Sequence, residues 1–463
     1  MQKLIAKYGA AAHLAILAVA PLFLFPFVGV RATATVVLWL SAIALVWTFL
    51  EPSLLRGEAL HNARERVVSK VVRDPLFWVM VLIAVFAGVR ALNSGIGMAY
   101  DAEVSKWYVK AAYVPFFPGT VGEAGRLPFA TSVALVVILT GCRHSLGQSA
   151  RMSFLLVSSA LAGLAALVAL FALELENPCV CKAAGFSRDY SFVGVAFGMC
   201  LLAGTVAMAA AFERKWNKLI PLVIFSMGGT AAGAFVFAPA ALSFVVCVSE
   251  FVLMAYVFVY LCSVLEGAEK FKFLVITGVA VTLGGLSVVL LVPDQLLQEK
   301  LTPFVTWTIL DEPFFKLRAA LTNLAIKSWL QHIWIGTGLA SFSLDFQFSA
   351  GADDWALVQR GAVALPNGWL QVLVERGVVG VFVLLIPCGF LTVAYFRRAF
   401  SGFKSWSLPH PACFLYPLTC VSLVLIGFVD CSLWRADVLM FTGALWAVSA
   451  RGFPLVKGAG HGQ

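Results

Sequence analysis

Residues 152–173 read MSFLLVSSALAGLAALVALFAL, an apolar stretch that contains no charged side chain. The hydrocarbon core of a bilayer is about 30 Å thick and an α-helix rises about 1.5 Å per residue, so roughly 20 such residues cross it. The stretch therefore predicts a membrane-spanning helix. Outward from it, eleven more stretches show the same pattern, at residues 12–30, 32–50, 76–92, 127–140, 190–212, 219–236, 241–265, 273–292, 372–396, 413–429 and 433–450.

Composition agrees with this pattern. Of the 463 residues, 61% are hydrophobic and 12% are charged, whereas soluble domains have roughly 45–50% and about 25%. The mean hydropathy is +0.92. These values exclude an ordinary soluble enzyme and predict an all-α polytopic membrane protein with about twelve spanning helices. The net charge of +9 would suggest nucleic acid in a soluble protein. Here topology explains most of the basic residues, and we expect no nucleic-acid partner.

The distribution of basic residues predicts the orientation. With the N-terminus inside, more than half of the Lys and Arg residues fall in cytoplasmic segments, as the positive-inside rule requires. Both termini are then cytoplasmic. The first span lacks a small-residue cleavage site, so we interpret it as retained and not as a signal peptide. The chain divides into residues 1–292 with nine spans, an external loop at 293–371, and residues 372–463 with three spans and a cytoplasmic tail.

The external loop begins with a predicted amphipathic helix at residues 314–334. At about 100° per residue, one face carries Lys316, Asn323, Lys327 and Gln331, and the opposite face carries Leu321, Ala325, Trp329 and His332. Arg318 falls with the second set, and a buried Arg needs an anion or a carboxylate. It binds either a phosphate or an acid of the loop, such as Asp311, Asp353 or Asp354. His332 is either a packed histidine or a base.

Two motifs flank the second half of this loop. The first is Trp334-Ile335-Gly336-Thr337-Gly338-x-x-x-Phe342, and the second is Asn367-x-x-Leu370-Gln371-x-x-x-Glu375-x-Gly377-x-x-Gly380. A Gly-x-Gly turn alone carries little information, because tight turns use the same residues. Together with the loop between them and the predicted spans, the two motifs resemble the signature of the O-antigen ligase and polymerase superfamily.

The resemblance implies an inner-membrane glycosyltransferase of the GT-C type. Such an enzyme moves a glycan from an undecaprenyl-diphosphate carrier to a glycan or lipid acceptor at the periplasmic face, without metal or other cofactor. Cationic donors must stabilise the departing diphosphate, and Arg provides them. The candidates are Arg318 and Arg188, which lies near the family's first periplasmic Arg but also beside Asp189. The family often has a second Arg after the seventh span, where residues 235–240 have none.

A base must also take the proton of the acceptor hydroxyl. The family's motif usually has His before its Asn, but this chain has Pro366 there. The base is then expected among His332, Asp353, Asp354 and Glu375. The candidate substrate-binding residues are Asn367, Trp369, Gln371, Glu375, Arg376 and Arg435. Structural alternatives stay open: Glu375 as a helix cap or ion-pair partner, Arg376 as a residue reaching the headgroups, and Arg435 as a partner of Asp430.

Other features fit more than one function. Cys179 and Cys181 share a short external loop, and a disulfide across one residue is strained. The aromatic residues of loop 93–126 either stack on sugars or form an interfacial belt. Two rival functions stay open besides the transferase. One is a transporter or flippase for a lipid-linked glycan, and the other is a catalytically inactive relative that acts in a polysaccharide assembly complex.

Overall fold

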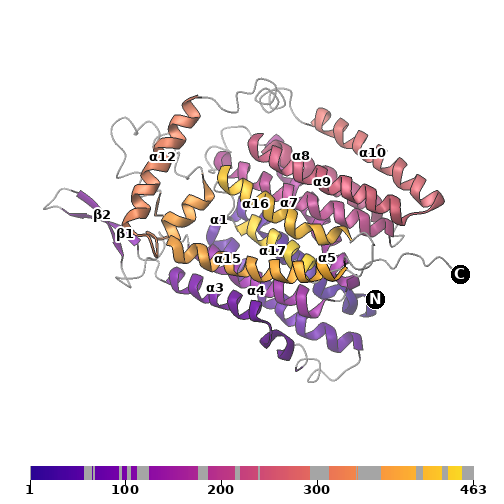
Figure 1. The fold of residues 1–463 in the computed structure, drawn as a ribbon, viewed down its shortest axis with the longest axis horizontal. Helices are drawn as coiled ribbons and strands as arrows, with labels where there is room; N and C mark the ends of the chain where they lie inside the picture. The colour runs from indigo at the N-terminus through magenta and orange to yellow at the C-terminus, as the bar shows by residue number, and fades with distance from the viewer. Residues whose placement is uncertain are drawn as a thin grey trace.

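The structure is a computed structural model that describes residues 2–56, 65, 68–92, 96–101, 106–111, 125–146, 148–175, 186–213, 219–237, 240–291, 312–339, 341–342, 367–402, 410–429 and 436–450. Helices dominate it (Figure 1). They are α1 (Gln2–Arg56), α3 (Pro75–Leu92), α4 (Arg126–Thr140), α5 (Gln148–Leu175), α7 (Phe186–Glu213), α8 (Ile220–Phe237), α9 (Ala240–Val264), α10 (Gly267–Leu291), α12 (Glu312–Gln331), α15 (Gly368–Gly402), α16 (Leu415–Val429) and α17 (Ala436–Ala450). A π-helical turn, η1 (Gly141–Ser145), follows α4, and a 3-10 turn, η6 (Pro411–Phe414), precedes α16.

A helix lies at each of the twelve predicted apolar stretches. Within the described residues, seven segments are long and apolar enough to cross a membrane, and four shorter apolar helices accompany them. The chain is therefore a polytopic helical membrane protein. That all twelve stretches cross the membrane stays a prediction, as do the orientation and the division into three parts.

Helix α1 contains the first two predicted spans. The His13 ring stacks on Trp47 with the ring centroids 5.2 Å apart. In one straight helix, residues 13 and 47 would lie about 50 Å apart. The two halves of α1 therefore lie side by side, and the chain reverses direction between His13 and Trp47. The two halves of α1 therefore form two antiparallel helices, as expected for two separate spans.

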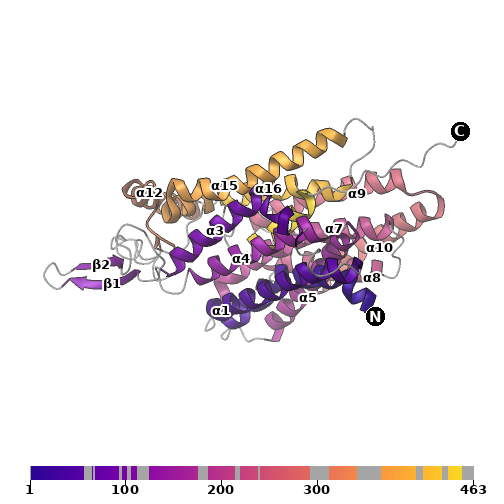
Figure 2. The same cartoon turned by 90° about the horizontal axis from the view of Figure 1, so that it is seen from below.

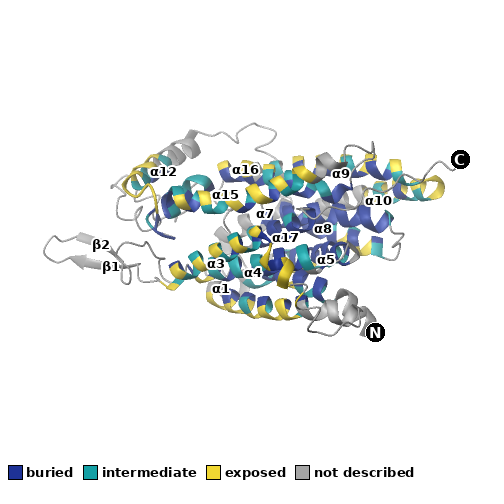
Figure 3. Ribbon diagram, turned by 60° about the horizontal axis from the view of Figure 1, so that its bottom comes forward, coloured by how far each residue is buried: buried dark blue, intermediate teal, exposed yellow. Residues whose placement is uncertain are grey.

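The core of the bundle surrounds α7, whose side chains from Gly194 to Glu213 are almost all buried. Helices α5, α8 and α9 pack against it. Small residues let the helices approach closely: a Cβ added to Gly163 of α5 would lie 2.6 Å from the backbone of Ser226 in α8. Lipid gives apolar helices no hydrophobic reason to associate, so close packing of this kind holds them together. Buried residues fill the middle of the bundle and exposed residues lie along its outside (Figure 3).

The two ends of the bundle differ. The start of α1 lies at one end, and α12 lies at the other with a short hairpin (Figures 1 and 2). The hairpin pairs β1 (Ile96–Asp101) with β2 (Lys106–Ala111) in antiparallel register, with Tyr100 opposite Trp107. We call the end that carries β1, β2, α12 and the start of α15 the loop end. The predicted functional residues of the two motifs belong to it.

Candidate functional site

Helix α15 is interrupted at Gly377, close to the loop end. The backbone there has φ +66° and ψ −172°, a conformation essentially restricted to glycine. The helix thus consists of a short segment, 368–376, and a long segment, 378–402. The predicted span at 372–396 missed this break and began four residues late. A break of this kind leaves backbone N–H and C=O groups without the partners that a continuous helix provides.

The turn that follows α12 supplies those partners. The N–H groups of Thr337 and Gly338 donate to the carbonyls of Val374 and Glu375 at 2.8 and 3.1 Å. In return, the N–H groups of residues 378 and 379 donate to the carbonyls of residues 333 and 334 at 2.9 and 3.1 Å. The two motifs of the sequence therefore meet backbone to backbone. Each motif therefore supplies backbone hydrogen-bond partners to the other.

Two glycines make this junction possible. Gly336 has φ +74°, and a Cβ added to it would lie 2.5 Å from the backbone nitrogen of Arg376. A Cβ on Gly377 would overlap the carbonyl of Trp334. Any side chain at either position would push the turn and the helix apart. The Gly-x-Gly turn, which carried little information alone, is thus required by the packing.

Polar side chains brace the same junction. Asn367 is the N-cap of α15, since its Oδ1 accepts hydrogen bonds from the N–H groups of Trp369 and Leu370 at 2.9 and 3.0 Å. Gln371 donates through Nε2 to the Glu375 carboxylate at 3.3 Å. The Thr337 and Ser341 hydroxyls lie 2.6 Å apart. Asn367 and Gln371, predicted to bind substrate, therefore have structural partners in this structure.

Arg90 of α3 reaches the junction from the other side. Its side chain is 1% exposed, and its Nη2 donates to the Glu375 carbonyl at 3.1 Å and to the Ile335 carbonyl at 3.5 Å. Its guanidinium lies over the Phe86 ring, 5.5 Å from the centroid. Sequence reasoning missed Arg90. The available signal was a basic residue inside the apolar stretch 76–92, because ionisable groups in spanning segments are costly and usually functional.

Arg90, Arg376 and Glu375 form a charged group. The positive charge of Arg376 repels that of Arg90, while the negative charge of the Glu375 carboxylate attracts both guanidinium groups. Glu375 is itself buried. Among the described residues, this group contains two cations and one anion. Guanidinium groups in a region of low dielectric constant bind anionic ligands by charge-assisted hydrogen bonds.

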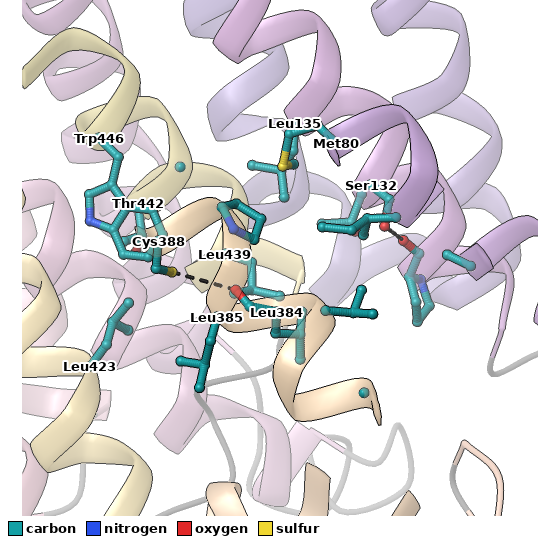
Figure 4. Close-up of a pocket in the computed structure, with 18 of the residues that line it drawn as sticks. Met80, Ser132, Leu135, Leu384, Leu385, Cys388, Leu423, Leu439, Thr442 and Trp446 are labelled. Atoms are coloured by element: carbon teal, nitrogen blue, oxygen red, sulfur yellow. Dashed lines mark hydrogen bonds between the residues drawn. The ribbon is translucent and has the colours of Figure 1, made fainter. Parts of the chain in front are cut away.

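A cavity of about 830 Å³ lies next to this charged group. Its polar lining at the loop end comprises Arg90, Arg376, Gln371 and Trp369, and the rest is mainly apolar. Figure 4 shows the walls: Met80 of α3 with Ser132 and Leu135 of α4, Leu384 and Cys388 of α15, and Leu439, Thr442 and Trp446 of α17. The far wall includes Tyr416, whose hydroxyl donates to the Cys388 carbonyl at 2.7 Å. The cavity therefore combines mainly apolar walls with two arginines at its loop end, which suits an apolar molecule that carries an anionic group.

The other predicted residues either do not line the cavity or lie outside the residues that the structure describes. His332 is exposed in the turn just after α12, which ends at Gln331, three residues earlier than predicted. Arg188 lies on α7 and Arg318 on α12, but their side chains are outside the described residues. Asp353, Asp354, Arg435, Pro366, Cys179 and Cys181 also lie outside the described residues. The roles of all these residues stay predictions.

Comparison with known proteins adds no assignment. No model of a known protein family matches the sequence, and no curated protein matches it. The resemblance to the O-antigen ligase and polymerase superfamily thus depends on the two motifs, the loop between them and the predicted spans. Function has to be inferred from the chemistry of the cavity and of the charged group beside it.

Proposed function

We propose that the protein is a membrane glycan transferase of the O-antigen ligase or polymerase type. It would take a glycan from undecaprenyl diphosphate and move it to a glycan or lipid acceptor at the periplasmic face. The cavity is the observation that carries this proposal. Its mainly apolar walls suit a polyprenyl tail, and Arg90 and Arg376 at its loop end suit a diphosphate, which guanidinium groups bind by charge-assisted hydrogen bonds.

The chemistry follows from this placement. The acceptor hydroxyl attacks the anomeric carbon, the bond to the diphosphate breaks, and negative charge develops on the departing phosphate. Fixed cations stabilise that charge because they need no reorganisation during the reaction. The acceptor hydroxyl must also lose a proton. Glu375 is the described carboxylate that interacts with both arginines, and His332, exposed in the adjacent turn, is the second candidate for the base.

One observation favours a second candidate function. The Glu375 side chain is 7% exposed and is not part of the cavity lining, and it already accepts a hydrogen bond from Gln371. A protein that binds the lipid-linked glycan without transferring it needs the cavity and the arginines but no base. An inactive relative in an assembly complex, or a transporter of the lipid-linked glycan, would match this description.

The two functions differ in the fate of the donor. The purified full-length protein is incubated with an undecaprenyl-diphosphate-linked oligosaccharide and a lipid-A-core acceptor, and both donor binding and release of the free carrier are measured. Release coupled to a longer or acceptor-linked glycan supports the transferase. A donor that binds but stays intact over a panel of acceptors supports the second candidate. If the donor does not bind at all, both are wrong.

A further inference from the structure

Helix α12 has three faces, although an ordinary amphipathic helix has two. Leu321 and Ala325 are buried against α15. At about 100° per residue, the remaining surface divides into an apolar strip with Ile326 and Leu330 and a polar strip with Asn323, Lys327 and Gln331. All five of these side chains are exposed. One face therefore meets protein, and the exposed surface is half apolar and half polar.

The apolar strip continues beyond the end of α12. Ile333, Trp334 and Ile335 in the following turn are exposed, and Trp334 is 69% exposed. We call Ile326, Leu330, Ile333, Trp334 and Ile335 the apolar strip of the loop end. Contiguous apolar surface of this kind on a folded protein usually marks an interaction site.

The position of the strip indicates what it contacts. The Trp334 carbonyl accepts a hydrogen bond from the N–H of Val379, so the turn lies directly against α15. Val379 and Phe382 are exposed apolar residues of a segment long and apolar enough to cross a membrane. The apolar strip is thus continuous with the lipid-facing surface of α15. The polar strip beside it, with Lys327, provides the water-facing side of a helix that lies at a bilayer surface.

We propose that the apolar strip of the loop end is seated in the headgroup–acyl boundary of the membrane, with α12 parallel to the bilayer surface. Trp, like Tyr, is enriched at this depth of the membrane. The placement fixes the charged group of Arg90 and Arg376 near the level of the lipid phosphates. A lipid-anchored ligand could then enter the cavity without leaving the membrane. The placement does not depend on which ligand fills the cavity.

Depth-dependent fluorescence quenching tests this placement. The full-length protein and its Trp334→Phe variant are reconstituted into phosphatidylcholine–phosphatidylglycerol vesicles with bromine either near the headgroup end or near the end of the acyl chains. The difference between the two proteins isolates the signal of Trp334, and phenylalanine keeps the surface apolar. Trp39→Phe gives the matched calibration, because Trp39 is 68% exposed in the middle of the segment Arg31–Thr48.

We expect the Trp334 signal to be quenched more by bromine near the headgroups, and the Trp39 signal more by bromine near the chain ends. Three results would overturn the proposal. Quenching of Trp334 by aqueous iodide but not by brominated lipid would place the strip in water. Protection from both quenchers would mean that protein covers the strip, such as a second copy of the chain. A depth profile equal to that of Trp39 would place it in the bilayer centre.

Discussion

Arg376, like Arg90, lines the cavity and interacts with Glu375. We expect Arg376→Gln to weaken binding of undecaprenyl diphosphate by roughly 10- to 100-fold, since a hydrogen bond to a charged group contributes about 1.5–3 kcal/mol. Binding of a fluorescent undecaprenyl diphosphate to the purified protein measures this. The control is Lys327→Gln, which removes an exposed cation from the same end of the bundle. Equal losses in both variants would mean that general charge, and not the cavity, attracts the diphosphate.

The site shows what sequence could and could not predict at the scale of residues. Glu375 and Arg376 were singled out from the sequence because they lie within a recognisable motif. Arg90 was not, because its contacts with residues 335 and 375 come from packing between segments distant in the chain. His332 was predicted on the packed face, but α12 ends before it and the side chain is exposed. Leu321 and Ala325 were predicted correctly, since helical periodicity is a local property.

Among the elements, the broken helix α15 depends on one residue, Gly377. We expect Gly377→Ala to lower the free energy of unfolding by about 1–3 kcal/mol or more, because the backbone conformation at Gly377 is strained for any other residue and the new Cβ overlaps the Trp334 carbonyl. Gly389→Ala is the matched control in the same helix, where a Cβ meets nothing within 4 Å. It should be neutral or stabilise the helix by up to about 1 kcal/mol. Thermal unfolding in detergent compares the two variants. Equal melting temperatures would show that the break in α15 does not require glycine at position 377.

The elements also show which features can be predicted from one segment and which depend on contacts between distant segments. Helices lie at all twelve predicted stretches because apolar length is read directly from the chain. The break at Gly377 escaped prediction because the groups that satisfy it belong to the turn after α12. The hairpin of β1 and β2 was likewise missed in a loop interpreted only by its aromatic residues. Pairing between segments is not contained in the periodicity of either segment.

At the scale of the whole molecule, helices α3 and α4 form one wall of the cavity, and this wall is fixed at both ends. Arg90 fixes it at the loop end. At the opposite end of α3, the Asp74 carboxylate accepts one hydrogen bond from the Leu76 N–H at 3.1 Å and pairs with Arg143 at 2.6 Å and His144 at 2.7 Å. Arg143 and His144 belong to the π-helical turn η1. Asp74 therefore ties the start of α3 to the end of α4.

This tie makes the stability of the wall depend on pH. Burial opposes ionisation of Asp74, but the His144 hydrogen bond, the Arg143 charge and the Leu76 N–H together hold the pKa of Asp74 below its ordinary value. A carboxyl group whose pKa is lowered by folding stabilises the folded protein at pH values above its unfolded pKa of about 3.9. This stabilisation is lost as the pH falls through the pKa of the folded state. We expect Asp74→Asn to lower the melting temperature by several degrees at about pH 7, and the difference from wild type to vanish towards about pH 2. Glu266→Gln, at an exposed position between α9 and α10, is the control and should change little at either pH. A difference that persists undiminished at the lowest pH would show that Asp74 stabilises the wall by packing and not by its charge.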